Sequence, residues 1–451
     1  NLSEVLNKSL LFYEAQRSGV LPYDNRISWR GDSLISDGMP NFNMTGGYYD
    51  GVSNVKFHFP MAFSMTMLAW GIIEFKDAYE AAGQYDYALD ALKWGTDYIE
   101  KMIINRNNTD TRSRHYVFRT IVGQVGDPST DGRLWERPEE LSATRPVYTL
   151  SGNLRGTDLA AEISAALAAA SIAFEPKDAA LSSRLFNKAR HVYHDIARQT
   201  PYVKYSSSIL SGPNYYPSSG YEDELEWAAI WFYKKTKRPI YKNRAKAHYM
   251  AHSREFSWDV KSVKSMQMGQ KNRMKNRPIF PHPTVYNSGN ISDLVYQMER
   301  YKRTKTLTIL PQLKLNKERY PAKYAANAAF LLMLAYRKFP NAQNAKGWRD
   351  AGIRQISYLL GGNKKRQSFV VGFGRISPTQ PLHKGSSCPL PPNRCGHTFK
   401  NRDQPNPNIL YGALVGGPTP LDDFSDLRTE EEQSRVSLDA NAGFQAAVAG
   451  I

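Results

Sequence analysis

The chain has 451 residues, of which 41% are hydrophobic and 22% charged, and its formal net charge is +17. This hydrophobic content is enough for a large, well-buried core. No uninterrupted apolar run reaches the ~20 residues that a membrane-spanning helix needs, so we expect no membrane span.

The predicted elements are helices, taken here in chain order. Residue 1 opens directly into a polar, helix-compatible stretch, so we expect any signal peptide to be absent from this numbering. Residues 59–75 are apolar nearly all round, which predicts an inner, buried helix. In residues 85–104 polar and apolar turns alternate at helical period, which predicts another helix. Residues 158–174 are alanine-rich, which allows close helix packing. The same pattern predicts helices at 181–198, 223–236, 322–339, 344–360 and from about 439 to 451.

No strand–helix alternation is present, although short strands are compatible with residues 369–373. Loops rich in Gly, Pro and Asn separate the helices, and no Pro/Ser linker divides the chain. We therefore expect an all-α protein whose residues 1–451 form a single domain.

The chain has two cysteines, Cys388 and Cys395, in a proline-rich stretch that is typical of a surface loop. They are either two free thiols or a disulfide that closes the loop, and we predict the disulfide. Five glycosylation sequons agree with a secreted, extracellular protein. They begin at Asn1, Asn7, Asn43, Asn107 and Asn290.

The positive charge is concentrated in one block. Residues 234–305 contain 18 Lys and Arg against four acids, a net of +14, which leaves only +3 for the rest of the chain. This block indicates an anionic partner at one face, or alternatively a solvated surface that keeps the protein soluble. Nucleic acid is an unlikely partner, because no recognised nucleic-acid motif accompanies the charge.

Several motifs spread along the chain carry a family resemblance. Residues 9–29 read SLLFYEAQRSGVLPYDNRISW, residues 45–60 TGGYYDGVSNVKFHFP, and residues 218–233 SSGYEDELEWAAIWFY. Residues 405–418 read PNPNILYGALVGGP, and residues 439–444 DANAGF. This set resembles glycoside hydrolase family 9, especially its animal endoglucanases. The resemblance implies an (α/α) barrel of six helical hairpins with a substrate cleft across one end.

The resemblance also identifies two positions for acid–base chemistry, which an inverting glycosidase performs with two carboxyl groups. The family's Asp-Ala-Gly-Asp motif reads Asp50-Gly51-Val52-Ser53 here, so Asp50 is retained and the principal base position is Ser53. The family's acid, counted back from Asp439, falls at Arg435. A hydroxyl without its own base and a permanently charged guanidinium cannot fill these roles. This predicts a catalytically degenerate member with no catalytic residues of the family kind.

Neighbouring carboxylates could in principle compensate. Asp50 is a candidate base, and Glu430, Glu431 and Glu432 precede the acid position. A solvated acidic cluster is the alternative reading of the three glutamates.

The family's sugar-binding positions are altered as well. The resemblance places an arginine where a stacking tryptophan stood and keeps one histidine of a His-His pair. Cations at such positions favour an anionic polymer over a neutral glucan, although drift of an abandoned cleft would also explain them. The candidate substrate-binding residues are Trp135, Arg137, Tyr215, Tyr216, Arg319, Lys323, His383 and Lys384.

A loop before the predicted helix at 223–236 matches one that binds calcium in many family members. Hydroxyl, carbonyl and carboxylate oxygens suit this cation, and its role here would be structural. Ordinary helix capping by the acids is the alternative. The candidate ligands are Ser219, Gly220, Asp223, Glu224 and Asp259.

These observations favour a secreted, non-catalytic cellulase homologue that acts as an extracellular binding or matrix protein. Its expected partner is an anionic polysaccharide or an acidic extracellular protein, and self-assembly is a further option. The alternative function is that of an endo-β-1,4-glucanase with residual or altered glycoside hydrolysis.

Overall fold

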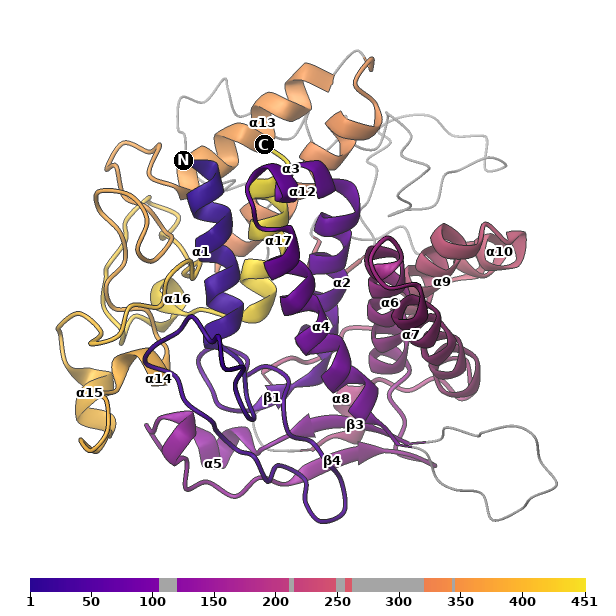
Figure 1. Cartoon of the computed structure of the whole chain (residues 1–451), viewed down its shortest axis with the longest axis horizontal. Helices are drawn as coiled ribbons and strands as arrows, with labels where there is room; N and C mark the ends of the chain where they lie inside the picture. Colours follow the sequence, from indigo (N-terminus) through magenta and orange to yellow (C-terminus); the bar gives the residue numbers. More distant parts are fainter. Residues whose placement is uncertain (105–119, 211–214, 249–255, 262–319, 343–344) are drawn as a thin grey trace.

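The inner layer of helices is buried along most of its length and forms most of the core. The computed structural model describes residues 1–104, 120–210, 215–248, 256–261, 320–342 and 345–451. Helix α2 packs against both α6 and α17, while α6 also contacts α9 and α17 contacts α12 (Figure 1). The bounds of these inner helices are α2 His58–Glu74, α6 Thr157–Phe174, α9 Glu222–Thr236, α12 Pro321–Lys338 and α17 Leu438–Ala449.

Outer helices cover this layer, and each buries one face. In α4, for example, Ala88, Leu92 and Ile99 are fully buried at helical spacing, whereas the opposite face is solvated. Helices α4, α7, α10 and α13 pack on α2, α6, α9 and α12 respectively. The outer helices are α1 Leu2–Ala15, α4 Tyr85–Met102, α7 Ala179–Val192, α10 Pro239–Ala247 and α13 Ala345–Leu359; α3 (Lys76–Ala81) joins α2 to α4, and a π-helical turn (Tyr193–Ala197) extends α7.

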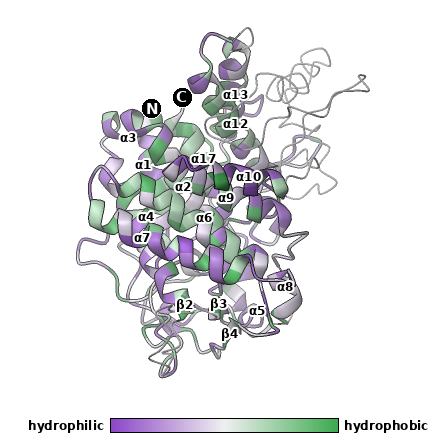
Figure 2. Ribbon diagram, turned by 90° about the vertical axis from the view of Figure 1, so that its right-hand side faces the viewer, coloured by the Kyte–Doolittle hydropathy of each residue, from purple (hydrophilic) through white to green (hydrophobic). Residues whose placement is uncertain are grey.

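Small side chains set the spacing of the inner helices. A Cβ atom on Gly443 of α17 would lie 1.8 Å from Oδ1 of Asn327 in α12, so the two helices meet at a distance that only glycine permits. Helix α6 is the one described helix that is long and apolar enough to cross a membrane, yet almost all of it is buried inside the protein. The apolar residues of α6 therefore belong to the protein core, and Figure 2 shows the hydropathy of this helix.

A small antiparallel sheet lies at the end of the helical layers opposite to the two chain termini (Figure 1 and Figure 2). Strand β3 (Thr120–Val125) pairs with β1 (Lys56–Phe57), β2 (Ile103–Ile104) and β4 (Val147–Leu150), with a bulge between Val122 and Gln124. The sequence analysis did not predict this sheet. At residues 369–373, where short strands were considered, the structure has only an isolated bridge from Val370 to Leu414.

The described chain has few other regular elements, and they are short. They occupy the connections that follow β3, the π-helical turn after α7, and α13. Their bounds are α5 Pro128–Gly132, a 3-10 turn at Pro138–Glu140, α8 Tyr205–Ser208, α14 Lys384–Ser387, α15 His397–Asn401 and α16 Glu431–Ser434.

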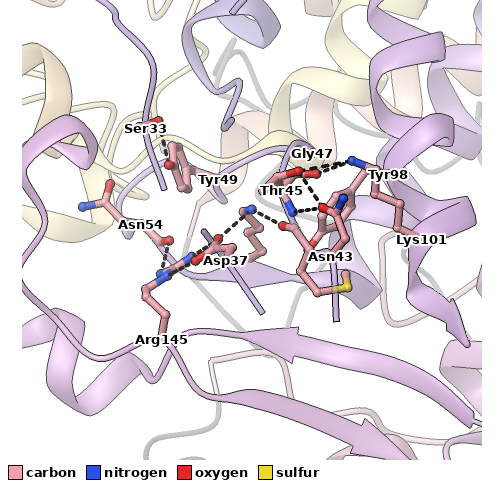
Figure 3. A network of polar contacts seen from close by, with 12 residues as sticks. Ser33, Asp37, Asn43, Thr45, Gly47, Tyr49, Asn54, Tyr98, Lys101 and Arg145 are labelled. Carbon is pink, nitrogen blue, oxygen red and sulfur yellow. Dashed lines mark hydrogen bonds and ion pairs between the residues drawn. The ribbon is translucent and has the colours of Figure 1, made fainter. Parts of the chain in front are cut away.

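Buried ion pairs fix the long segment between α1 and α2 (Figure 3). Asp37, which is 2% exposed, accepts from Nζ of Lys56 at 2.7 Å and from Nε and Nη2 of Arg145 at 3.0 and 3.1 Å. Burial alone would raise the pKa of Asp37, but the two cations outweigh it and hold that pKa below its usual value. Arg145 also donates to the Asn54 carbonyl at 2.7 Å, which ties the segment to β4.

We expect Asp37→Asn to lower the free energy of unfolding by about 3–5 kcal/mol, because it leaves two buried cations without a carboxylate. The measurement is urea unfolding at neutral pH. The matched control is Asp97→Asn, which removes an exposed carboxylate that pairs with Lys93 and should cost about 0.5 kcal/mol or less. Equal losses in the two variants would contradict the structural role of this network.

Candidate active site

Loops that precede four inner helices meet at one end of the helical layers. Asp50 precedes α2, Tyr216 precedes α9, Tyr320 directly precedes α12, and Arg435 and Asp439 flank the start of α17. Since the first turn of a helix favours negative charge, this end is suited to hold carboxylates.

The backbone of the Asp50 loop is pinned against the start of α17. The Leu438 amide donates to the Asp50 carbonyl at 2.9 Å, and Gly51 forms a bridge with Ser437. Gly51 has φ +137°, and a Cβ atom there would lie 2.5 Å from the Val436 carbonyl oxygen. The position therefore requires glycine. The backbone of this loop fixes the direction in which the Asp50 side chain points.

The Asp50 carboxylate is 2% exposed and has two polar neighbours. The Tyr216 hydroxyl donates to its Oδ1 at 2.5 Å, and Nη2 of Arg435 lies 3.7 Å from its Oδ2. Burial raises the pKa of Asp50 to about 6, although Arg435 and Tyr216 both oppose the rise. Asp50 can therefore exchange a proton near neutral pH, as a general base must.

Arg435 lies between two tyrosine rings. Its guanidinium carbon is 5.7 Å from the centre of the Tyr215 ring and 5.5 Å from that of Tyr320. Burial opposes its charge, but the neighbouring Tyr216 and Asp50 hold the pKa of Arg435 above its ordinary value. With 17% of the side chain exposed, Arg435 presents a permanent positive charge to solvent at this site.

A second carboxylate, Asp439, has partners of its own. Its Oδ1 accepts from the Ser437 hydroxyl at 2.6 Å, and its Oδ2 accepts from Nζ of Lys323 at 3.1 Å. Lys323 is buried, and its ammonium lies 5.1 Å from the Tyr324 ring centre. Lys323 thus neutralises Asp439 from inside the protein.

Ser53, at the position where the resemblance implies a catalytic base, is partly exposed. Its hydroxyl is buried and has no hydrogen-bond partner among the described residues. The preceding Val52 packs onto a small apolar cluster of Trp135, Leu382 and Cys388. The loop that carries Ser53 is therefore in contact with the segment that contains the two cysteines.

Trp135 and Arg137, two of the predicted sugar-binding residues, are buried in this region. The Trp135 ring nitrogen donates to the Ser387 hydroxyl at 2.9 Å. Arg137 is 2% exposed and bonds to the Pro389 carbonyl and to Glu140. Both side chains hold the 128–140 and 384–389 segments together.

His383 and Lys384 are buried in the same layer. His383 accepts from the Ser386 amide at Nδ1, and its Nε2 lies 3.1 Å from the Gln16 side-chain oxygen. Burial lowers the pKa of His383 to about 3, so the ring is neutral at ordinary pH. Nζ of Lys384 contacts Oδ2 of Asp131 at 2.7 Å, and its pKa is lowered by burial against the effect of that carboxylate.

The predicted sugar-binding set therefore falls into two groups. Tyr215, which is 46% exposed, Tyr216 and Lys323 lie around Asp50 and Arg435. The remainder of the described set forms the buried layer beside the Ser53 loop. Arg319 lies outside the described residues.

The three glutamates before Arg435 are exposed on or beside α16. Glu431 pairs with Lys400 at 3.1 Å. Most of the basic block at 234–305 lies outside the described residues, and within its described part Lys234 pairs with Glu74.

Cys388 and Cys395 are joined by a disulfide, with Cα atoms 5.3 Å apart. Of the sequons, Asn1 accepts from the Ser3 amide at the start of α1, and exposed Asn43 accepts from Thr45. Asn7 is partly exposed in α1. Asn107 and Asn290 lie outside the described residues.

The predicted calcium ligands lie close together, and protein donors engage one oxygen of each of the three carboxylates, while Oε2 of Glu224 is buried with no hydrogen-bond partner among the described residues. The Ser219 amide donates to Oδ1 of Asp259 at 2.7 Å, and the Lys261 amide donates to Oδ2 of Asp223 at 2.8 Å. Nζ of Lys261 contacts Oε1 of Glu224 at 2.8 Å. The Gly220 carbonyl accepts from Ser218 at 2.7 Å.

In the described part of the chain, no group of three His, Cys, Asp or Glu side chains is arranged to hold a metal ion. The calcium site therefore stays a prediction.

Sequence reasoning missed Asp131 and Lys261 as partners within this region. Asp131 meets Lys384 across 253 residues of sequence, and Lys261 meets Glu224 across 37. No local pattern marks such pairs. An isolated lysine three residues after an aromatic core position was the one available signal for Lys261.

Comparison with known proteins places this geometry in context. Residues 3–448 match the family described as "Glycosyl hydrolase family 9". Endoglucanase 7 of Arabidopsis thaliana is 37% identical and covers 100% of this chain and 76% of its own length, and Endoglucanase 1 of Persea americana is 36% identical with 99% and 92% coverage. The solved endoglucanase of the termite Nasutitermes takasagoensis is 36% identical, with a TM-score of 0.79 and coverage of 100% and 98%.

These matches confirm the predicted family and its (α/α) six-hairpin barrel. They also overturn the interpretation of the chain as a non-catalytic protein, because relatives named endoglucanases match it over its whole length. That interpretation rested on Ser53 and Arg435 alone. It gave too little weight to Asp50, which the structure keeps as a buried carboxylate with a raised pKa.

We expect Tyr216→Phe to raise the pKa of Asp50 above 6, because the variant loses the hydrogen bond to the ionised form. The measurement is the carboxyl ¹³C titration of protein labelled in aspartate, with Asp50→Asn to assign the signal. Tyr205→Phe is the control, because the Tyr205 hydroxyl donates to the Tyr216 carbonyl and not to Asp50. An unchanged pKa in Tyr216→Phe would contradict the assigned contact.

Proposed function

The chain belongs to glycosyl hydrolase family 9, and on that premise we propose that it hydrolyses β-1,4-glucan with a catalytic apparatus altered from the family's pattern. The observation that carries the proposal is Asp50, a carboxylate held at the meeting point of four inner-helix loops with a pKa of about 6. The endoglucanase names of the full-length relatives support the substrate class.

In the proposed reaction Asp50 acts as the general base. A water molecule attacks the anomeric carbon and gives one proton to the Asp50 carboxylate, while the glycosidic C–O bond breaks. The leaving oxygen takes its proton from a second water molecule, which becomes hydroxide and is neutralised by the proton on Asp50, since Arg435 cannot donate one at ordinary pH. Arg435 and Tyr216 hold Asp50 in its ionised form between turnovers.

This chemistry is slower than that of an enzyme with both family carboxyl groups. A positioned general acid or base raises the reaction rate about 100- to 10,000-fold, so the loss of one such group lowers the rate by the same factor. The fixed charge of Arg435 also disfavours a positively charged transition state nearby.

The exposed side of the site suits a sugar ring with a negative substituent. Tyr215 offers a half-exposed ring for stacking, and Arg435 beside it offers a charge for a carboxylate or sulfate. A cellulase solved with cellobiose, Cel9M of C. cellulolyticium, is 25% identical with a TM-score of 0.78 and supports a sugar-binding cleft. We therefore propose an anionic β-1,4-glucan as the better substrate.

We further propose that the protein is secreted. The Cys388–Cys395 disulfide supports an oxidising compartment, and the exposed sequon at Asn43 is compatible with glycosylation there.

We expect the chain to release reducing ends from soluble cellulose derivatives, faster from carboxymethyl than from hydroxyethyl cellulose. Asp50→Asn should abolish the release, and below pH 6 the wild-type rate should fall about tenfold per pH unit as Asp50 is protonated. Asp32→Asn is the control, an exposed aspartate whose carboxylate accepts from the Leu21 amide. Equal rates in wild type and Asp50→Asn would refute the proposed mechanism.

We expect the double variant Ser53→Asp with Arg435→Glu to be faster than the wild type by about 100-fold or more, because it restores both carboxyl groups. The measurement is the same reducing-sugar assay. Ser53→Asn with Arg435→Gln is the control for side-chain shape. A double variant no faster than this control would show that the two positions do not limit the rate.

A further inference from the structure

Positive side chains gather where the C-terminal end of α7 meets α10 on the outer layer of helices. The π-helical turn that extends α7 carries Tyr193 and His194, and α10 carries Tyr241 and Arg244. The Tyr193 and Tyr241 rings both pack on Phe232 of α9, with ring centres 5.0 and 5.1 Å away. Helix α9 therefore holds the two segments together, and both lie at the same edge of the molecule in Figure 1.

Two arginines from these segments lie close to one histidine. Nη1 of Arg244 is 3.3 Å from Nδ1 of His194. Arg198 follows the π-helical turn, and its guanidinium carbon is 5.9 Å from the centre of the Tyr193 ring. Burial, Arg244 and Arg198 lower the pKa of His194 to about 4, against the opposing effect of Asp195. The histidine is therefore neutral at ordinary pH, and the positive charge of this region belongs to the arginines.

Four arginines form this cluster, and carboxylates do not balance them. The members of the arginine cluster are Arg190, Arg198, Arg238 and Arg244. Over the ranges that the structure describes, no carboxylate lies within ion-pair distance of any of the four. The neighbouring acids pair with histidines: Asp195 lies 3.4 Å from His191, and Glu222 lies 2.6 Å from His248.

Helix dipoles account for only part of this charge. A helix C-terminus attracts cations, but it carries a charge of only roughly −0.5, so the ends of α7 and α10 balance about one of the four arginines. Arg238 precedes the first residue of α10, the end at which a helix disfavours a cation. Burial lowers the pKa of Arg244, and the charges of Arg198 and Arg238 lower it further. An anion bound to the arginine cluster would relieve this repulsion.

The surface around the arginine cluster suits a flexible polyanion better than a folded protein. Protein interfaces depend on apolar or aromatic anchors near their centre. Here Tyr193 and Tyr241 are buried, and in the described α7, π-helical turn and α10 the only large apolar side chain that is exposed is Ile240. A guanidinium binds sulfate or carboxylate groups through paired N–H donors, and anionic polysaccharides carry both groups. The Cys388–Cys395 disulfide favours an oxidising compartment, which argues against nucleic acid.

We propose that the arginine cluster is a binding site for an anionic polysaccharide, separate from the residues around Asp50. The arginine cluster belongs to the outer helices α7 and α10 and the residues that flank them, whereas Asp50, Tyr216 and Arg435 belong to loops before inner helices. The site holds the protein on a charged polymer whether or not the polymer is cleaved. Binding there does not require the proposed hydrolysis.

Heparin, which carries sulfate and carboxylate groups, is the probe for this site. We expect Arg198→Gln with Arg244→Gln to weaken the binding of a fluorescent heparin oligosaccharide about tenfold or more at physiological salt, because two guanidinium contacts are lost. The measurement is a fluorescence anisotropy titration. The matched control is Arg349→Gln with Arg375→Gln, which removes the same charge from two exposed arginines elsewhere and should weaken binding about twofold or less.

Three outcomes of this titration would overturn the proposal. Equal weakening in the two double variants would show that net charge alone attracts heparin. A wild-type chain that does not bind heparin would remove the ligand class. Tighter binding of single-stranded DNA or polyglutamate of the same charge would replace the polysaccharide with another kind of polyanion.

The wild-type chain offers a second measurement that does not depend on how the variants fold. Phenylglyoxal modifies accessible guanidinium groups, and peptide mass spectrometry reports the modification of each arginine. We expect the heparin oligosaccharide to slow the modification of Arg198 and Arg244 several-fold and to leave Arg349 and Arg375 unchanged. Modification of Arg198 and Arg244 at the same rate with and without heparin would refute the site.

Discussion

Much of the structure depends on one constraint: a buried carboxylate needs a cation or hydrogen-bond donors within the protein. Taking a charged group out of water costs several kcal/mol, and only a close opposite charge with good geometry offsets that cost. Several carboxylates are buried in this protein, and a lysine or arginine from another part of the chain meets most of them, whereas Asp158 accepts from two backbone amides. The pairs are Asp37 with Lys56 and Arg145, Asp50 with Arg435, Asp131 with Lys384, Glu162 and Glu224 with Lys261, and Asp439 with Lys323.

This constraint changes how the cations of the site are understood. Lys323 and Lys384 were predicted to face an anionic ligand, yet both are buried against carboxylates of the same chain. Arg435 has two roles, because it neutralises Asp50 on one side and remains partly exposed beside Tyr215 on the other. The positive charge that a substrate meets near Asp50 is therefore that of Arg435.

Local patterns predicted the helices well, and long-range pairing lay beyond them. Residues 59–75 are apolar nearly all round and residues 158–174 are alanine-rich, so both helices followed from composition and periodicity, and α2 and α6 begin within one residue of the expected positions. The sheet was missed because β1 and β2 have two residues each, too few for an alternating pattern. Motif spacing located Asp50, Ser53 and Arg435. It could not show that Lys384 meets Asp131 across 253 residues, because such a contact exists only in the fold.

The central claim is that Asp50 supports glycosidic bond cleavage in this chain. Cellopentaose of defined length, incubated with purified protein and followed by mass spectrometry, tests it most directly, because shorter oligosaccharides can arise only by cleavage. The account predicts cellobiose and cellotriose from the wild-type chain, at a rate above that of the protein without the Asp50 carboxylate. Cellopentaose that stays intact over a long incubation, with protein that remains folded, would contradict it.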